Sequence, residues 1–247
     1  MKKNIFKGSP DKVTCVIPCA GEGTRLQGDI AGNERIAKAM VPIAGKPIIW
    51  NVVNYWSQFA DEFIFIVKFQ MEKIMEYIDG LPIKSSFIEQ KELRGIAYAL
   101  SLTENMVSDN FIMVLGDCLC KGNFDFPADM GMGVGVWPTD REEDIKRSYS
   151  VKIEDNRILQ VVEKPKLLVN NLCGMGFYFF NRKVFDYIRK TKPSKLRNEV
   201  EITDTLQEII NGGDILHPLH FNGEYLNVTY AEDIERAEIL IRNEVSG

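Results

Sequence analysis

Short apolar segments bounded by turn residues alternate with longer amphipathic stretches along the first half of the chain. The apolar segments are rich in β-branched and aromatic residues, and they predict strands at 13–18, 63–69, 86–88 and 111–115. The stretches between them are long enough for helices at 47–59, 71–79 and 95–106. This alternation is typical of βαβ units built around a parallel sheet.

The second half has a different pattern, in which short strand-like segments follow one another. They predict strands at 131–137, 150–154, 158–163 and 174–180 and helices at 181–190, 199–211 and 231–244. Turn signals such as 154–156 favour antiparallel pairing here. We therefore expect an α/β protein with a Rossmann-like three-layer α/β/α fold and a mixed, mostly parallel central sheet.

Composition narrows the class of protein. Of 247 residues, 45% are hydrophobic and 26% are charged, which is ordinary for a globular chain. The net charge is -5 and no run of Lys and Arg is dense, so nucleic-acid binding is not expected. No stretch approaches the roughly 20 apolar residues of a membrane span, and the basic N-terminus lacks the apolar core of a signal peptide. We expect a cytoplasmic protein without a membrane partner.

Five cysteines, an odd number, stand at positions 15, 19, 118, 120 and 173. Their C-x3-C and C-x-C spacings have no following His or Cys at metal-binding distance in sequence. Cys15 and Cys118 fall inside apolar segments predicted as strands. Reduced, buried structural thiols are therefore expected rather than zinc ligands or nucleophiles.

The first predicted strand leads into a glycine-rich turn at 20–26, where open α/β sheets place their ligands. The turn has neither the P-loop pattern nor the dinucleotide fingerprint, because Leu26 stands where a third glycine is required. Gly21 and Gly23 let the backbone approach a ligand, and Arg25 suits bidentate contact with a phosphate. A turn that only connects a strand to a helix would have the same composition, so assigning this turn to phosphate binding depends on what other residues indicate.

Lys38 enters an otherwise apolar, turn-forming stretch about a dozen residues later and is a second candidate phosphate cation. The turn and this lysine together resemble the sugar-phosphate nucleotidyltransferase family, whose pattern is G-x-G-T-R, a loop, then P-K-x-x-x-P-x-x-x-K-P. Lys38 matches the reactive lysine of that pattern. Ala37 replaces its usual Pro, and residues 30–36 depart from the common form. Lys46 matches the final lysine but could equally be a solvent-facing residue before a helix.

The resemblance implies a nucleotide site in the first half of the chain. It gives Ala20, Gly21, Gly23 and Thr24 to the nucleotide and Arg25 and Lys38 to catalysis. Segment 90–100 looks like the family's Q-x4-G segment, so Gln90 would bind the base edge and Gly95 would let the backbone approach it. Asp117 ends a predicted strand at the same sheet edge as the glycine turn, where a hard carboxylate ligand for Mg²⁺ belongs.

The resemblance also implies an acceptor site in the second half. Residues 161–165 match the V-x-E-K-P element, which gives Glu163 to a sugar hydroxyl and Lys164 to the sugar's phosphate. Tyr149 falls at a Y-G-V position, and Asn171 and Gly176 at a segment that closes the acceptor pocket. Asn227 stands where many members have the second metal-ligating Asp, and its carbonyl oxygen is a weaker ligand for Mg²⁺.

The resemblance therefore implies one nucleotidyltransferase domain over 1–247, with a nucleotide-binding half at 1–130, an acceptor-binding half at 131–230 and a C-terminal helix at 231–247. Its partners would be an NTP and a phosphorylated small molecule, with Mg²⁺ as cofactor and a sugar 1-phosphate as the favoured acceptor. Three questions stay open: whether the acceptor is instead a phospho-alcohol, amino alcohol or phosphonate, whether the chain is a catalytically silent nucleotide-binding regulator, and whether it forms a homo-oligomer.

Overall fold

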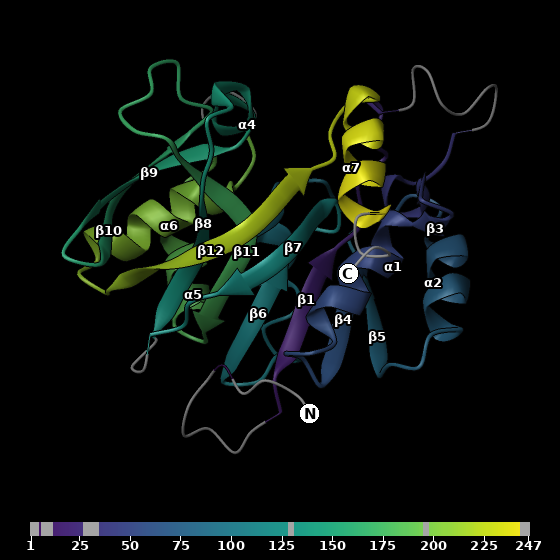
Figure 1. Ribbon diagram of the computed structural model, residues 1–247. Coiled ribbons are helices and arrows are strands. Elements are labelled where there is room, and N and C mark those ends of the chain that lie inside the picture. The colour runs from purple at the N-terminus through teal and green to yellow at the C-terminus, as the bar shows by residue number, and fades with distance from the viewer. Residues whose placement is uncertain (1–4, 6–11, 27–34, 128–130, 195–197, 243–247) are drawn as a thin grey trace.

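A mixed sheet forms the centre of the protein in the computed structural model, which describes residues 5, 12–26, 35–127, 131–194 and 198–242 (Figure 1). Its first part is parallel and has the order β5 (Ser85–Glu89), β4 (Glu62–Val67), β1 (Thr14–Pro18), β6 (Asn110–Val114). All four strands come from the first half of the chain. They correspond to the four strands predicted there.

Strands of the second half continue the sheet beyond β6. The order is β11 (Leu172–Asn181), β8 (Met132–Pro138), β12 (Leu216–Asn227), β7 (Cys118–Phe124). β11 is antiparallel to both β6 and β8, β12 is parallel to β8, and β7 is antiparallel to β12. A hairpin of β9 (Tyr149–Glu154) and β10 (Arg157–Glu163) joins β11 through β9. The expected mixed sheet is confirmed: the strands of the first half pair in parallel, and those that follow pair antiparallel except for β12 with β8.

Two hydrophobic cores cover the two faces of the sheet, because side chains of a strand alternate between faces. Cys15 and Ile17 belong to one core and Val16 to the other. Helices α1 (Ile48–Trp56), α2 (Met71–Asp79) and α7 (Glu232–Arg242) contribute to the first core. Helices α3 (Ile96–Ser101), α5 (Val184–Lys190) and α6 (Ile202–Asn211) contribute to the second. The arrangement is the predicted three-layer α/β/α fold.

The sequence-based prediction lacks β7, β12 and the short helix α4 (Glu142–Arg147), as well as the small elements between the glycine turn and α1. β7 and β12 contain Gly122 and Gly223, which lie opposite each other with φ near +150°, and β12 also contains Pro218. Glycine and proline interrupt a strand pattern in the sequence. A Cβ on Gly122 would lie 2.2 Å from the carbonyl oxygen of Asn222, so the close approach of these two paired strands requires the glycines.

The boundaries of other elements also differ from the prediction. α3 ends at Ser101, where turns replace the rest of the helix predicted to 106, and α5 begins at Val184 rather than at 181. Two small elements, the 3-10 helix η1 (Lys38–Met40) and the hairpin of β2 (Pro42–Ile43) and β3 (Lys46–Pro47), connect the glycine turn region to α1. Expectations for most of the N-terminal segment, for residues 30–34 and for the end of the helix predicted to 244 lie outside the described residues.

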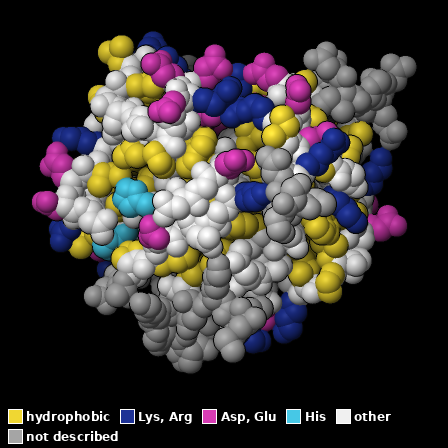
Figure 2. Space-filling model, viewed as in Figure 1, with side chains coloured by type: hydrophobic (Ala, Val, Ile, Leu, Met, Phe, Trp, Pro, Cys, Tyr) yellow, Lys and Arg dark blue, Asp and Glu magenta, His cyan; other side chains and the backbone are white. Residues whose placement is uncertain are grey.

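The surface in Figure 2 carries Lys and Arg side chains interspersed with Asp and Glu rather than gathered into one patch. Within the described residues, no helix combines the length and the apolar content that crossing a bilayer requires.

Candidate active site

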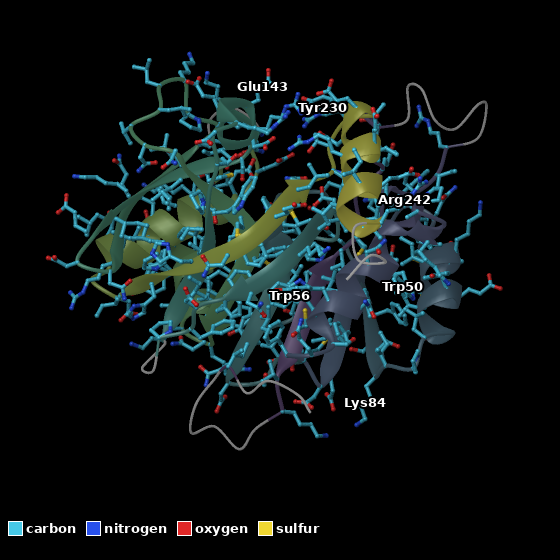
Figure 3. The ribbon with its side chains drawn as sticks, viewed as in Figure 1. Trp50, Trp56, Lys84, Glu143, Tyr230 and Arg242 are labelled. Atoms are coloured by element: carbon cyan, nitrogen blue, oxygen red, sulfur yellow. The ribbon has the colours of Figure 1, made fainter. Side chains whose placement is uncertain are left out.

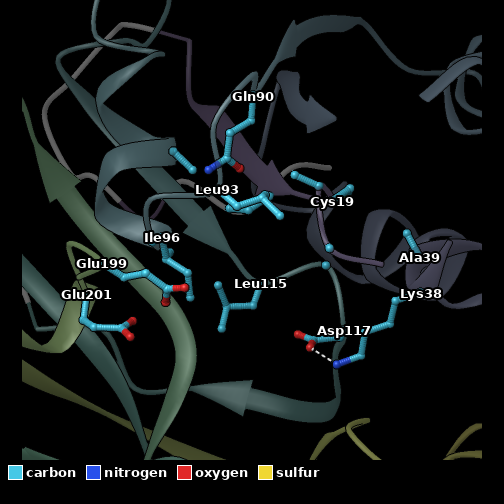
Figure 4. Close-up of a pocket in the computed structure, with 16 residues that line it drawn as sticks. Cys19, Lys38, Ala39, Gln90, Leu93, Ile96, Leu115, Asp117, Glu199 and Glu201 are labelled. Carbon is cyan, nitrogen blue, oxygen red and sulfur yellow. Dashed lines mark hydrogen bonds and ion pairs between the residues drawn. The ribbon is translucent and has the colours of Figure 1, made fainter. Parts of the chain in front are cut away.

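A cavity of about 350 Å³ opens where β1, β5 and β6 end, at the carboxyl edge of the parallel part of the sheet (Figure 4). Ligands of open α/β sheets bind at this edge. The cavity contains the following residues from the predicted nucleotide site: Ala20, Gly21, Lys38, Gln90, Gly95 and Asp117. These residues are far apart in sequence, and the strand order brings them together.

An ion pair between Lys38 and Asp117 lies on one side of the cavity. Lys38 is the first residue of η1, and Asp117 follows β6 by three residues. Their side chains are only 19% and 22% exposed, so both charges are largely shielded from water and each is balanced by the other. The stem of Lys38 packs against the glycine turn, since a Cβ on Gly23 would lie 2.7 Å from the Lys38 Cβ.

Gln90 and Gly95 form another wall of the cavity. Gln90 directly follows β5, is 4% exposed, and its backbone N–H donates to the Val67 carbonyl at 2.9 Å. Gly95 has φ +99°, and a Cβ there would lie 2.4 Å from the carbonyl oxygen of Val200. Backbone hydrogen bonds fix this approach: Val200 N–H donates to Arg94 at 2.7 Å, and Ala97 N–H donates to Val200 at 3.1 Å.

Glu199 and Glu201 line the cavity from the segment that leads into α6, and sequence reasoning missed both. Figure 4 shows them on the opposite side of the cavity from Lys38. They flank Val200, so the hydrogen bonds to segment 94–97 also hold the two carboxylates beside the Gln90 wall. The signal in the sequence was two glutamates around an apolar residue at the start of the helix predicted over 199–211, which in the structure begins only at Ile202.

Asn227 ends β12 close to the backbone of Asp117. Cys118 pairs with Asn227 in the β7–β12 register, and Val228 N–H donates to the Asp117 carbonyl at 3.0 Å. The amide oxygen of Asn227 accepts a hydrogen bond from the Thr229 hydroxyl at 3.2 Å, which leaves a second lone pair. The described residues contain no group of three or more His, Cys, Asp or Glu side chains able to hold a metal. Asn227 lines a second, smaller hollow with Asp144 and Arg147 rather than the cavity that contains Asp117. Carboxylate and amide oxygens are of the kind that Mg²⁺ takes as ligands, together with water and substrate phosphates.

A buried carboxylate fixes the turn after Asn227. Asp233, 1% exposed, accepts backbone N–H groups of Thr229 and Tyr230, both at 2.9 Å, and pairs with Arg147 of α4 at 3.5 Å. The Arg147 guanidinium also lies 4.7 Å from the centre of the Tyr230 ring. Figure 3 labels Tyr230 and Glu143 of α4 on the same side of the molecule, where these elements meet.

Several predicted site residues lie outside the cavity lining. Thr24 and Arg25 are exposed on the turn that follows Gly23. Lys46 is exposed, and its ammonium lies 5.5 Å from the centre of the Trp50 ring on α1 (Figure 3), as expected for a solvent-facing lysine.

The predicted acceptor residues lie in β9, β10 and β11 or directly beside them, Lys164 following β10 and Asn171 preceding β11. Tyr149 is buried at 2% exposure and its hydroxyl donates to the Met175 carbonyl at 2.9 Å, so its side chain is a core group away from the cavity. Gly176 is buried too, and a Cβ there would lie 2.6 Å from the Cys118 sulfur. Asn171 is exposed and its carbonyl accepts the N–H of Thr139.

Glu163 and Lys164 are exposed and pair with each other at 3.4 Å. Glu163 also accepts a hydrogen bond from the Thr203 hydroxyl at 3.3 Å. Thr203 follows Glu201 by two residues on α6, so Glu163 stands next to the acidic side of the cavity.

All five cysteines are free and buried, as predicted. Burial raises the pKa of each thiol, in Cys173 to about 12. Cys19 also lines the cavity, and the negative charge of Asp117 adds to the increase of its pKa. These groups are protonated at neutral pH and are poor nucleophiles or metal ligands.

Comparison with known proteins agrees with this geometry. The family model described as "Nucleotidyl transferase" matches residues 14–237. This chain belongs to the nucleotidyl transferase family. Among relatives in this family, the "Bifunctional protein GlmU" of Methanocaldococcus jannaschii is 31% identical over 231 residues, which cover 94% of this chain and 55% of that protein. The chain thus spans about half the length of its GlmU relatives.

Two other family relatives match over nearly their whole length. The "UTP--glucose-1-phosphate uridylyltransferase AglF" of Haloferax volcanii is 29% identical, with coverage of 94% of this chain and 97% of that one. The crystal structure of a putative glucose-1-phosphate thymidylyltransferase from Bacillus anthracis superposes with a TM-score of 0.80 at 25% identity, covering 94% and 96% of the two chains. Sequence and fold thus agree on the family.

Proposed function

We propose that this chain is a Mg²⁺-dependent enzyme that transfers a nucleoside monophosphate from an NTP to a sugar 1-phosphate and releases pyrophosphate. The observation that carries the proposal is a single cavity that gathers Lys38, Asp117, Gln90 and Gly95 at one sheet edge. Lys38 would supply a cation for the phosphates, Asp117 a carboxylate for a metal, and the wall formed by Gln90 and Gly95 a surface for the base. The names of the AglF relative and the Bacillus anthracis neighbour, a uridylyltransferase and a thymidylyltransferase for glucose 1-phosphate, support a glucose 1-phosphate type of acceptor.

In the proposed reaction an oxygen of the acceptor phosphate attacks the α-phosphorus of the NTP. The bond from that phosphorus to the oxygen bridging to the β-phosphate breaks, and pyrophosphate leaves in line with the attack. The protein needs to position two anions and to neutralise their charge, and no covalent intermediate is required. Lys38 would exchange its ion pair with Asp117 for contact with the triphosphate, with Arg25 supporting from the neighbouring turn.

Asp117 and Asn227 would hold Mg²⁺, whose chemistry here is to neutralise phosphate charge and to orient the reacting oxygens. On the acceptor side, Lys164 would bind the phosphate and Glu163 a sugar hydroxyl. Glu199 and Glu201 face the cavity and can accept further hydroxyl hydrogen bonds. The side chain of Tyr149 is given no role, because it is buried.

The direct test is pyrophosphate release with each common NTP, Mg²⁺ and a panel of hexose 1-phosphates. We expect turnover with at least one pair, and a loss of about 10²–10³-fold in kcat for Lys38→Ala, the usual effect of removing a group that stabilises developing charge. Lys46→Ala is the matched control, because Lys46 is an exposed lysine outside the cavity, and it should retain wild-type kcat. Equal rates for the Lys38 and Lys46 variants would refute the assignment.

A phosphorylated amino alcohol is the second candidate acceptor, because Glu199 and Glu201 could bind an ammonium group as well as hydroxyls. Including ethanolamine phosphate and choline phosphate in the panel separates the two acceptor classes. Saturable NTP binding without release of pyrophosphate in the presence of any acceptor would instead favour a catalytically silent regulator.

A further inference from the structure

The backbone directly before Lys38 is held by the side chain of Gln70, which is more than 30 residues away in sequence. Gln70, directly before α2, makes two hydrogen bonds to segment 35–37. Its amide oxygen accepts the N–H of Ala37 at 2.8 Å, and its amide nitrogen donates to the carbonyl of Arg35 at 2.7 Å. Both polar ends of one amide are therefore used on the three residues that precede Lys38.

The conformation of Gln70 is not one that its local position favours. Its φ is +50° and its ψ is 39°, a left-handed conformation that glycine or asparagine adopts more readily. It also occupies the N-cap of α2, yet its side chain makes no cap hydrogen bond. A Ser, Thr, Asp, Asn or Gly would serve the helix better there. A residue held in an unfavourable conformation with its side chain directed to a site is a reason to look for a functional contact.

The hydrogen bond from the Ala37 N–H to Gln70 stands where the family pattern has a proline. The family pattern has proline before the lysine, and proline fixes φ near −65° without a backbone N–H. Ala37 has φ −55° and ψ 135°, which proline could adopt, but alanine itself leaves this angle free and carries an N–H to satisfy. Gln70 satisfies that N–H and restrains the same backbone from outside.

The backbone of Ala37 that Gln70 holds is continuous with the 3-10 turn that contains Lys38. Ala37 is fully buried, and its carbonyl accepts the N–H of Met40, which closes the 3-10 turn containing Lys38. The other side of the Lys38 stem packs on Gly23. The backbone and the stem of Lys38 are thus both held, and its ammonium pairs with Asp117 at the cavity.

We propose that Gln70 is a positioning residue for Lys38 and takes the place of the family's proline. The proposal rests on the proposed function of Lys38. Gln70→Gly relieves the left-handed backbone but leaves the buried N–H of Ala37 without its acceptor, so we expect the melting temperature to fall by no more than about 2–4 °C while kcat falls by roughly 10- to 100-fold, as for a catalytic group displaced by about 1 Å. The KM for the NTP should change less than kcat. Asn156→Gly is the matched control, because it relieves a φ of +57° in an exposed turn away from the cavity and should not alter kcat.

Two combined variants test whether Gln70 acts through Lys38. In a Lys38→Ala background, Gln70→Gly should cause no further loss of kcat, whereas independent roles would multiply the two losses. Ala37→Pro should restore most of the kcat lost in Gln70→Gly, since proline supplies the φ restraint and removes the N–H. In the presence of Gln70 it should impair the enzyme, because the proline ring would occupy the position of the Gln70 amide oxygen. Multiplied losses, or no rescue by proline, would overturn the proposal.

A measurement without turnover separates this proposal from the proposed function. Acylation of Lys38 by an amine reagent, followed by mass spectrometry with Lys46 as the internal reference, reports how firmly the ion pair with Asp117 is held. We expect severalfold faster acylation of Lys38 in Gln70→Gly than in the wild type. Unchanged acylation would refute the positioning role even if the enzyme is active, whereas an inactive wild type with the expected acylation change would refute only the proposed reaction.

Discussion

Gly95→Ala should disturb both halves of the cavity at once. The φ of Gly95 is +99° and its ψ is 168°, a region that is essentially restricted to glycine and costs other residues about 1–3 kcal/mol. The added Cβ would lie 2.4 Å from the Val200 carbonyl oxygen and 2.8 Å from the Val200 carbonyl carbon and nitrogen. The two segments must therefore separate by roughly 1 Å to reach ordinary contact.

The separation moves Glu199 and Glu201 away from the wall formed by Gln90. A displacement of about 1 Å can cost up to ~10²-fold in rate, so we expect kcat/KM to fall for both the NTP and the acceptor. The melting temperature should fall by about 2–4 °C for each kcal/mol of backbone strain. The assays are steady-state kinetics with each substrate varied, and differential scanning calorimetry.

Gly213→Ala is the matched control, because Gly213 has φ +86° but no atom within 4 Å of an added Cβ. It should lower the melting temperature through strain while leaving kcat/KM unchanged. If Gly95→Ala behaves like Gly213→Ala, or alters the kinetics of the nucleotide only, then Val200 does not couple the two walls.

Three further predictions concern stability. Burial raises the pKa values of thiols such as Cys15 and Cys118 above the unfolded value of about 9. The free energy of unfolding should therefore fall as pH rises above that value, by up to ~1.4 kcal/mol per pH unit for each buried thiol. Urea unfolding between pH 8 and 10.5 should show this fall, and a flat profile would contradict it. Gly122→Ala should lower the free energy of unfolding by at least ~2 kcal/mol in the same assay at pH 7.5, since the added Cβ would meet the backbone of Asn222. A variant as stable as the wild type would show that the pairing of β7 with β12 can relax. Asp233→Ala should lower stability by ~1–3 kcal/mol and reduce kcat, because two backbone donors lose their acceptor beside Asn227; a stable, fully active variant would argue against that role.

The parallel part of the sheet could be predicted from the sequence because its strands are apolar segments with clear turn signals on both sides. The placement of Asp117 at the edge that carries the glycine turn followed from the same pattern, since parallel strands end on one side. β7 and β12 could not be predicted, because Gly122, Gly223 and Pro218 interrupt their patterns. Only the pairing of two distant strands explains why these residues are tolerated there.

Some candidate site residues could likewise be predicted from the sequence, and others could not. Lys38, Gln90 and Gly95 follow strands or a recognisable motif, and the fold brings them into one cavity. Tyr149 looked equally suitable in sequence, but its neighbour across the sheet is Gly174, which leaves room for the ring to turn into the core. The contact of Gln70 with Ala37 spans 33 residues and depends on the side-chain conformation, which no local pattern displays.

The pairing of Lys38 with Asp117 also determines the charge that an arriving nucleotide meets. Among the described residues that line the cavity, one ammonium stands against three carboxylates, those of Asp117, Glu199 and Glu201. An uncomplexed NTP would meet a cavity of its own sign, whereas a nucleotide that arrives with its divalent cation brings much of the compensating charge with it. We therefore expect chelation of free Mg²⁺ to weaken nucleotide binding itself, and not only turnover, so that the cavity selects the cation complex as the form of nucleotide that enters.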